Sequence, residues 1–304
     1  MLLLVKYTLL YMVVLMMVAL GGMFSERSGI INIALEGIMV IGGLIGVIAA
    51  KYLALPPVWT VSLSILLAGV AGMIYALLLG YASVHLKADQ TIGGTALNIL
   101  ATALAMVIAK RLNGTQAPKI SYNNAPFLFN IGNLELNVFI PLGIVLLLIS
   151  YFILYKTRLG LRLRSCGEHP QAAASVGISV YKMRYIGVMA SGFLGGIGGL
   201  AYVLPAVSIW NFEQGVTGMG FLALAVMIFG QWKPFRIFLA AIFFSLFRAM
   251  ANIADSFPGL KELNWPKEIY NMMPFIASMI VLALTSKNSR APKAEGIPYD
   301  TGAR

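Results

Sequence analysis

Long apolar runs, separated by short polar interruptions, follow one another along almost the whole chain. A helix needs about 20 apolar residues to cross a bilayer, and nine runs are of helix length. None shows the alternation of apolar and polar residues that is typical of a membrane β-barrel. The nine segments are 7–23, 30–50, 60–84, 91–110, 138–155, 185–206, 215–230, 237–254 and 269–286. The pattern predicts an all-α, polytopic membrane helix bundle with about nine or ten transmembrane helices.

Composition excludes a soluble fold. Of the 304 residues, 59% are hydrophobic and only 11% are charged, whereas about a quarter of a soluble domain is charged. We therefore expect residues 1–304 to form a single transmembrane domain. A net charge of +11 would indicate a nucleic-acid partner in a soluble protein. Here the Lys and Arg residues must lie in short loops between spans, so we expect membrane lipid and no nucleic acid.

The Lys and Arg residues indicate the orientation, because cytoplasmic loops carry an excess of them. The loop at about 156–184 contains six and the tail at 287–304 contains four. We expect both to be cytoplasmic, together with the turn at 231–236. The loops at 110–137 and 256–267 are then expected outside.

The orientation of the N-terminus stays open at this point. Nine spans put it outside, whereas Lys6 and the terminal amine favour the cytoplasm. A tenth span or a re-entrant element between residues 24 and 60 would reconcile the two.

A short helix is predicted inside the 156–184 loop. Pro170 suits a first helical turn, the alanines after Gln171 favour helix, and Gly177 is a natural stop. A helix of about two turns is marginal alone in water, so this one must pack against something. The basic flanks and the flat alanine face favour docking to a partner protein. A surface helix that packs only on its own chain is the alternative.

Residues 25–37, SERSGIINIALEG, place two polar side chains within an apolar segment. A carboxylate near the membrane centre costs about 2.5 to 3.5 kcal/mol on insertion scales, so Glu36 must face a cavity or a partner. Asn32 lies four residues earlier and thus on the same helix face. This stripe either lines a translocation path or ties the helix to a neighbour, and the sequence leaves both open.

The fourth segment adds further candidates for the same path. They are Gln90, Thr91, Thr95 and Asn98. A helix-capping role for Asp89 and the residues after it is the alternative. Arg248, in the eighth segment, is expected near an interface or paired, and Glu36 is one conceivable partner.

Catalytic motifs are missing from the sequence. It has no Gly-Lys dipeptide, so the phosphate-binding loop GxxxxGK[ST] cannot be present. The two histidines, His85 and His169, form no HExxH motif, and the single Cys166 excludes an internal disulfide or a thiolate zinc cluster. We expect no catalytic residue, no metal and no cofactor in this chain, and an intramembrane enzyme is a poor alternative.

Four stretches together resemble the permease subunits of bacterial ATP-binding cassette importers. They are residues 25–37, GYASVHLKADQTIGGTALNIL at 80–100, RSCGEHPQAAASVGI at 164–178 and GMGFLALAVMIFGQWKP at 218–234. The nearest group is the simple-sugar and nucleoside branch of the branched-chain amino-acid permease family. NIALEG replaces the GGIDLSVG-like segment of ribose-type permeases, which favours the nucleoside subgroup.

The resemblance implies a transporter of the bacterial inner membrane. It would combine two permeases, identical or homologous, with two cytoplasmic ATPases that bind ATP and Mg, and with an extracytoplasmic substrate-binding protein. In this family a short cytoplasmic helix transmits ATPase closure to the membrane. The matching residues here are Gly167, Glu168, His169, Pro170, Ala172, Ala173, Ala174 and Gly177.

We therefore expect the permease of an ATP-driven nucleoside importer. A sugar or branched-chain amino-acid permease is the alternative within the family. On composition alone, a secondary transporter also remains.

Overall fold

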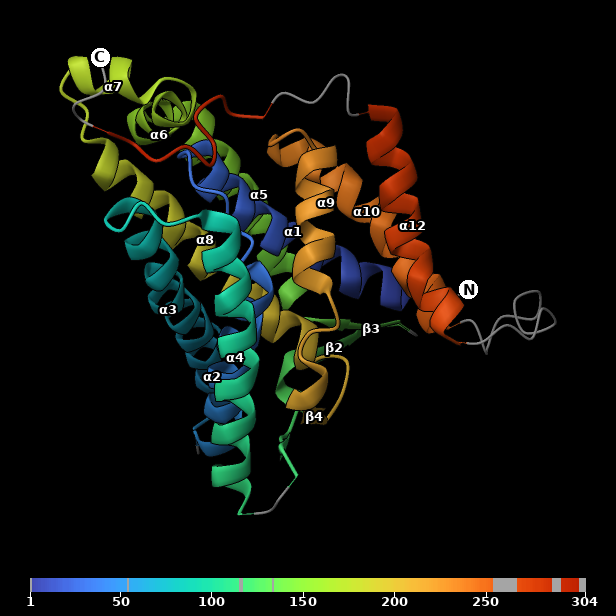
Figure 1. Ribbon diagram of the computed structural model, residues 1–304. Coiled ribbons are helices and arrows are strands. Elements are labelled where there is room, and N and C mark those ends of the chain that lie inside the picture. Colours follow the sequence, from blue (N-terminus) through green and yellow to red (C-terminus); the bar gives the residue numbers. More distant parts are fainter. Residues whose placement is uncertain are drawn as a thin grey trace.

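The computed structural model describes residues 2–53, 55–114, 117–132, 134–253, 267–285 and 291–300. Within this part the chain forms a bundle of long helices with a few short strands (Figure 1). The helices are α1 (Leu2–Arg27), α2 (Leu35–Tyr52), α3 (Pro57–Val84), α4 (Gln90–Asn113), α5 (Phe139–Lys156), α6 (Arg158–Glu168), α7 (Pro170–Ser175), α8 (Val180–Val203), α9 (Met219–Phe229), α10 (Pro234–Asn252) and α12 (Lys267–Thr285). The strands are β1 (Lys119–Ser121), β2 (Leu128–Ile131), β3 (Leu134–Asn137) and β4 (Ile209–Asn211).

Among the described residues, eight segments are long and apolar enough to cross a membrane. Seven are the helices α1, α2, α3, α4, α5, α8 and α10, and the eighth is Phe212–Phe229, which ends in α9. Helix α12, of 19 residues, coincides with the ninth predicted segment. The all-α, polytopic membrane bundle is thereby confirmed.

The bundle has two ends of different character. We call the end that carries α6, α7 and residues 291–300 the basic end, and the end that carries the four strands the strand end (Figure 1). Lys6 Nζ lies 2.6 Å from a carboxylate oxygen of Glu135, so the start of α1 lies beside β3 at the strand end. The described C-terminal residues lie at the basic end, which fits an odd number of crossings. The predicted 256–267 loop, apart from Lys267, lies outside the described residues, as do 286–290 and 301–304.

Helix α8 packs in the middle of the bundle, against α1, α2 and α3. Its glycines permit this: a Cβ on Gly192 would lie 2.5 Å from the carbonyl oxygen of Gly72 in α3, and one on Gly196 would lie 2.3 Å from that of Ala68. Small residues let helix backbones approach closely in membranes. By contrast, α4 exposes large apolar side chains such as Ile92 and Ile99, each 71% accessible. Lipid accommodates a face of this kind, which water would not.

The second predicted segment begins too early. Residues 28–34 are not helical, and α2 starts only at Leu35. The prediction that Asn32 and Glu36 share one helix face is therefore wrong. Gly29 has a φ of +98°, a value that L side chains rarely adopt, and it ends the helical path of α1. The irregular stretch between α1 and α2 lies in the region where the sequence left room for a re-entrant element.

Short strands at the strand end were not part of the prediction. β1 pairs antiparallel with β4, and β2 pairs antiparallel with β3. The first pair joins the loop before α5 to the segment after α8. Strands of three or four residues are too short to show a period-2 pattern.

Candidate functional site

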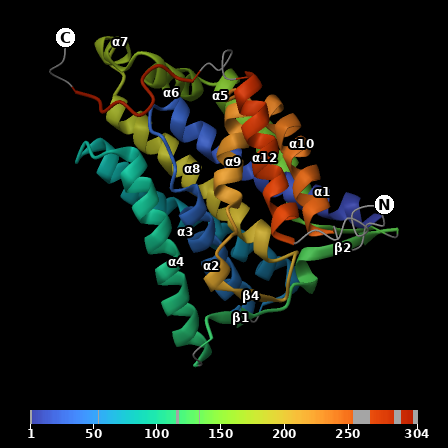
Figure 2. The same cartoon turned by 45° about the vertical axis from the view of Figure 1, so that its right-hand side comes forward.

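Helices α6 and α7 form the projecting part of the basic end (Figure 2). Thr157 caps α6, because its hydroxyl accepts a hydrogen bond of 3.2 Å from the N–H of Gly160. Pro170 stands in the first turn of α7, and Gly177, with a φ of +82°, follows its end. The short helix predicted from the sequence is confirmed, one residue shorter than Pro170 to Val176.

The predicted coupling residues divide into an inner and an outer set. Gly167, Pro170 and Ala173 are buried, and Ala173 packs in a cluster with Cys166, Val180, Met183 and Tyr299. Ala172, His169 and Gly177 are exposed, and Glu168 and Ala174 are half-buried. A hollow of about 260 Å³ lies between α6 and α7, and its lining includes His169, Ala172 and Val176. Of the predicted coupling residues, the exposed ones, which we call the outer set, are the most accessible to another protein.

Residues 291–300 run across the basic end and fasten α6 to the bundle. The N–H of Ala294 donates to the carbonyl of Gly167 (2.8 Å), and Nη2 of Arg184 donates to the carbonyl of Ile297 (2.9 Å). The N–H of Gly296 donates to the carbonyl of Gly29 (3.3 Å), which lies in the irregular stretch before α2. The tail therefore links α6, α8 and this stretch.

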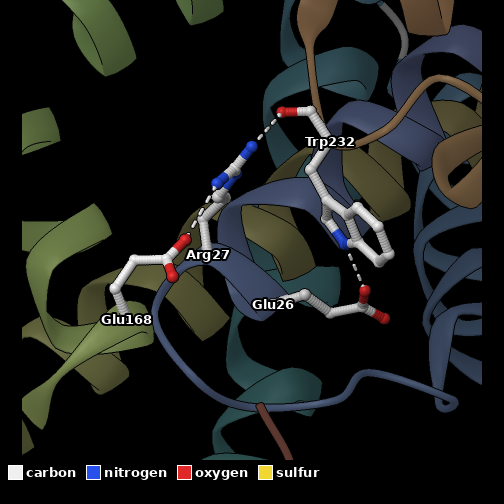
Figure 3. A network of polar contacts seen from close by, with 4 residues as sticks. All are labelled: Glu26, Arg27, Glu168 and Trp232. Atoms are coloured by element: carbon white, nitrogen blue, oxygen red, sulfur yellow. Dashed lines mark hydrogen bonds and ion pairs between the residues drawn. The ribbon is translucent and has the colours of Figure 1, made fainter. Parts of the chain in front are cut away.

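A polar network joins α6 to the end of α1 and to the turn before α10 (Figure 3). Nη1 of Arg27 lies 3.5 Å from a carboxylate oxygen of Glu168, and Nη2 of Arg27 donates to the carbonyl of Trp232 (3.3 Å). The indole N–H of Trp232 donates to the buried carboxyl of Glu26 (2.5 Å). A movement of α6 would act directly on the end of α1 through these bonds.

The irregular stretch at 28–34 is held by side-chain amides of other helices. Oε1 of Gln90 accepts from the N–H of Ile31 (2.7 Å), and Nδ2 of Asn98 donates to the carbonyl of Ile33 (2.9 Å). Asn98 also accepts from the N–H of Gly37 (2.7 Å), and Asn32 donates to Ser191 Oγ in α8 (2.8 Å). Inside a membrane, non-helical backbone must find such partners within the protein.

The remaining candidates of α4 lie on another face. Thr91 and Thr95 are exposed, and the Thr95 hydroxyl bonds back to the carbonyl of Thr91. Asp89 caps the helix by accepting from the N–H groups of Thr91 (2.8 Å) and Ile92 (2.9 Å), as the alternative interpretation proposed. The structure thus separates Gln90 and Asn98, which face the 28–34 stretch and the start of α2, from the two threonines.

Glu36, in the first turn of α2, faces the start of α9. Its carboxylate accepts from the N–H groups of Gly218 (2.7 Å) and Gly220 (2.6 Å). These amides lie at the N-terminus of α9, where the unpaired N–H groups and the helix dipole favour a negative charge. A Cβ on Gly220 would lie 2.5 Å from the backbone nitrogen of Glu36, so only glycine allows this approach.

Arg248 does not pair directly with Glu36. Its Nη2 donates to Oγ1 of Thr217 (3.0 Å), and its guanidinium lies 5.8 Å from the ring centre of Tyr11. Thr217 is the residue before Gly218, so Arg248 steadies the same turn that Glu36 holds. Arg248 therefore contacts a hydroxyl and an aromatic ring, and the conceivable ion pair with Glu36 is not formed.

Sequence reasoning missed the groups that Glu36 binds, because they are backbone amides. Trp232 and Arg27 were also missed, although Trp232 lies within the 218–234 stretch and Arg27 directly precedes the irregular one. A buried Trp at the end of an apolar segment, close to acidic residues in space, has no signature in sequence spacing.

Comparison with known proteins gives a family match and full-length relatives. A family model described as "Branched-chain amino acid transport system / permease component" matches residues 4–284. The nucleoside ABC transporter permease protein NupC of Lactococcus lactis subsp. cremoris (strain MG1363) is 40% identical, over 96% of this chain and 94% of its own. The guanosine ABC transporter permease protein NupQ of Bacillus subtilis (strain 168) is 39% identical, over 99% and 97%.

A more distant relative comes from the same Lactococcus strain. The nucleoside ABC transporter permease protein NupB is 25% identical, over 92% of this chain and 80% of its own. Among solved structures, none matches the chain significantly.

Proposed function

The chain belongs to the family of permease components of branched-chain amino acid transport systems, and on this basis we propose that it carries a nucleoside through the membrane. It is a multi-pass protein of the bacterial inner membrane. It is the non-catalytic permease of an ATP-binding cassette importer, and ATP hydrolysis belongs to a separate ATPase subunit. The transporter contains further permease subunits besides the ATPase.

One observation carries the choice of a nucleoside. Two relatives named for nucleoside or guanosine transport align over nearly their whole length at 39–40% identity. The alignments cover 96% and 99% of this chain and thus nearly all of its membrane segments, which in a permease also contain the solute path. A sugar or branched-chain amino-acid solute is the weaker alternative, because neither of these two relatives is named for one.

The partner permease is a homologous chain in this proposal. The Lactococcus strain has both NupC and NupB, and each resembles this chain to a different degree. A transporter that contains two unlike permeases would explain why one strain has both proteins. An extracytoplasmic substrate-binding protein would deliver the solute to the strand end.

The outer residues of α7 are the proposed contact with the ATPase. ATP and Mg would be bound by that ATPase subunit. Ala172 and Val176 are exposed and lie beside the hollow between α6 and α7. Gly167, Pro170 and Ala173 would hold this helix in place from inside. The basic flanks of the 156–184 loop support a cytoplasmic location of the basic end.

Movement of α7 would reach the membrane through a series of direct contacts. Glu168 pairs with Arg27, Arg27 precedes the irregular stretch at 28–34, and Glu36 follows that stretch and holds the start of α9. ATP can shift the bundle between two arrangements only if it binds one of them better. We propose that ATP favours an arrangement in which the stretch at 28–34 has moved against α9.

The solute path is proposed to run along this contact. Glu36 and Asn32 lie at its centre, with Gln90 and Asn98 supporting the stretch and Thr91 and Thr95 on the outer face of α4. Path lining stays a prediction for each of these side chains.

A substrate panel tests the proposal. The permease pair, its ATPases and its binding protein are reconstituted in proteoliposomes, and uptake of labelled guanosine, adenosine, uridine, ribose, glucose and leucine is measured. We expect uptake of one or more nucleosides. Uptake of a sugar or of leucine, with no nucleoside transported, would contradict the choice of solute.

A further inference from the structure

A polar cavity lies at the strand end, between α1, the end of α8, the segment that follows α8, and the end of α10. Its volume is about 340 Å³, within the range of roughly 300 to 1,000 Å³ that small-molecule sites occupy. Residues far apart in the sequence meet there: Tyr7 and Tyr11 come from α1, Tyr202 from α8 and Asn252 from α10. The cavity therefore depends on the assembled bundle.

Aromatic rings form a large part of the wall. The ring centres of Tyr7 and Tyr11 are 6.3 Å apart with planes inclined by 21°, and those of Tyr11 and Tyr202 are 6.4 Å apart, inclined by 37°. The indole N–H of Trp210 donates to the carbonyl of Gly215 (3.2 Å), which fixes that ring. Flat aromatic surfaces of this kind are the ones on which nucleic-acid bases stack, by about 1 to 3 kcal/mol per base.

Two of the ring-bearing side chains are also held by polar contacts. The Tyr202 hydroxyl is hydrogen-bonded to Thr217 Oγ1 (2.7 Å), which accepts from Arg248 (3.0 Å). Arg248 also lies over the ring of Tyr11. Arg248 thus contacts two residues of the lining, Thr217 and Tyr11, without being one of the residues that line the cavity.

Side-chain amides supply the polar part of the lining. They belong to Asn211, Gln214 and Asn252. Each amide offers a donor and an acceptor, the combination that pairs with the edge of a base. None of the described residues that line the cavity carries a charge. These lining residues therefore offer no charged partner for the ammonium and carboxylate groups of an amino acid.

From these observations we propose that the cavity binds the base of a nucleoside, stacked on the tyrosines and hydrogen-bonded by the amides. The inference rests on the proposed function and specifies the site at which the solute is first held. Thr217 in the lining adjoins Gly218, which Glu36 binds. A nucleoside in the cavity therefore lies beside the turn that begins α9.

Photo-crosslinking tests the site directly. The complete transporter in nanodiscs is irradiated with 8-azidoguanosine, and labelled peptides are identified by mass spectrometry. We expect labelling within 202–217 or within 7–11, with protection by excess guanosine and none by ribose or leucine. Label that is confined to other segments, or that guanosine does not displace, would overturn the proposal.

Binding by variants gives a second measurement. Gln214→Ala and Asn252→Ala remove exposed amides, so folding should be retained, and each should weaken guanosine binding by about tenfold. Asn130→Ala removes an exposed amide of β2 outside the cavity and serves as the matched control. Unchanged binding by both cavity variants would overturn the site even if the wild type imports guanosine. A wild type that neither imports nor binds any nucleoside would instead contradict the proposed function.

Discussion

The carboxylate of Glu36 accepts a hydrogen bond of 2.7 Å from the backbone N–H of Gly218, a residue 182 positions later in the chain. With the second bond, from Gly220 (2.6 Å), it joins the first turn of α2 to the first turn of α9. Helix α2 follows the irregular stretch at 28–34, and α9 follows a short 3-10 helix, Phe212–Gln214, and a turn. Irregular backbone at membrane depth is tolerated where it is buried in protein or lines a water-filled cavity, and such stretches can rearrange more easily than continuous helices.

Removing the carboxylate of Glu36 should weaken both the fold and transport. We expect Glu36→Ala to lower the free energy of unfolding by about 2 to 4 kcal/mol, since two amides lose a charge-assisted partner. Glu36→Gln retains one acceptor, so its free energy of unfolding should lie between those of the wild type and of Glu36→Ala. Thermal unfolding in detergent and uptake per assembled complex are the measurements. Glu213→Gln, an exposed carboxylate before α9, is the control, and wild-type uptake by Glu36→Ala would end the role of this contact in transport.

The two faces of α7 should respond differently to a large cation. Ala172 is exposed and Ala173 is buried in the cluster with Cys166 and Tyr299. We expect Ala172→Arg to leave the permease folded but to abolish co-purification of the ATPase. Ala173→Arg should destabilise the basic end itself, because a guanidinium would be desolvated there. Normal ATPase recovery with Ala172→Arg would contradict docking on α7; Asn130→Arg, at the strand end, controls for added charge.

Docking of the C-terminal tail should depend on pH. Burial raises the pKa of Glu295 from 4.5 to about 7, and the contacts with Glu26 and Arg27 offset this only in part. The docked tail therefore holds its proton more tightly than the free tail, so docking is strongest in acid and weakens as the pH rises through about 7. From this shift, docking should be about tenfold weaker at pH 8 than at pH 6.

Hydrogen exchange at residues 294–299, corrected for the intrinsic rate at each pH, measures tail docking. Glu26 and Arg27 interact with the Glu295 carboxyl, and the Trp232 indole is hydrogen-bonded to Glu26. Glu295→Gln should reduce the pH dependence. Asp300→Asn, which changes the other acid of the tail, should retain it. Equal protection of the wild type at both pH values would show that Glu295 does not control docking.

Labelling of introduced cysteines checks the orientation. In a Cys166→Ala background, we expect Ser175→Cys at the basic end to react only from the cytoplasm and Asn123→Cys at the strand end only from outside. Both positions are exposed, so each should react with a membrane-impermeant maleimide. The reason is the excess of Lys and Arg in the 156–184 loop. The reverse pattern of labelling would invert the whole assignment.

The sequence predicted the helices well because the membrane imposes a strong pattern. Each span must be long, apolar and internally hydrogen-bonded, so the nine apolar runs correspond to the long helices. The 28–34 stretch is the exception. Its isoleucines continue the apolar pattern of a span, and the partners that hold it, Gln90, Asn98 and Ser191, lie on other elements.

The candidate sites were predictable in part. Pro170 and Gly177 indicate α7 from local chemistry, and Glu36 stands out because an acid in an apolar segment needs a partner. Which partner it has could not be foreseen, since backbone amides carry no side-chain signal. The orientation of Ala172 outward and Ala173 inward depends on how α6, α8 and the tail pack, which is tertiary information.

In our proposal the permease moves a nucleoside only when its ATPase partner drives it. The most direct test is uptake of labelled guanosine by proteoliposomes that contain the complete transporter, with ATP, with a non-hydrolysable ATP analogue, or with a proton or sodium gradient and no ATP. We expect accumulation with ATP alone. Accumulation that a gradient supports without ATP hydrolysis, or that persists when the ATPase subunits are omitted, would contradict the proposal and indicate a secondary transporter.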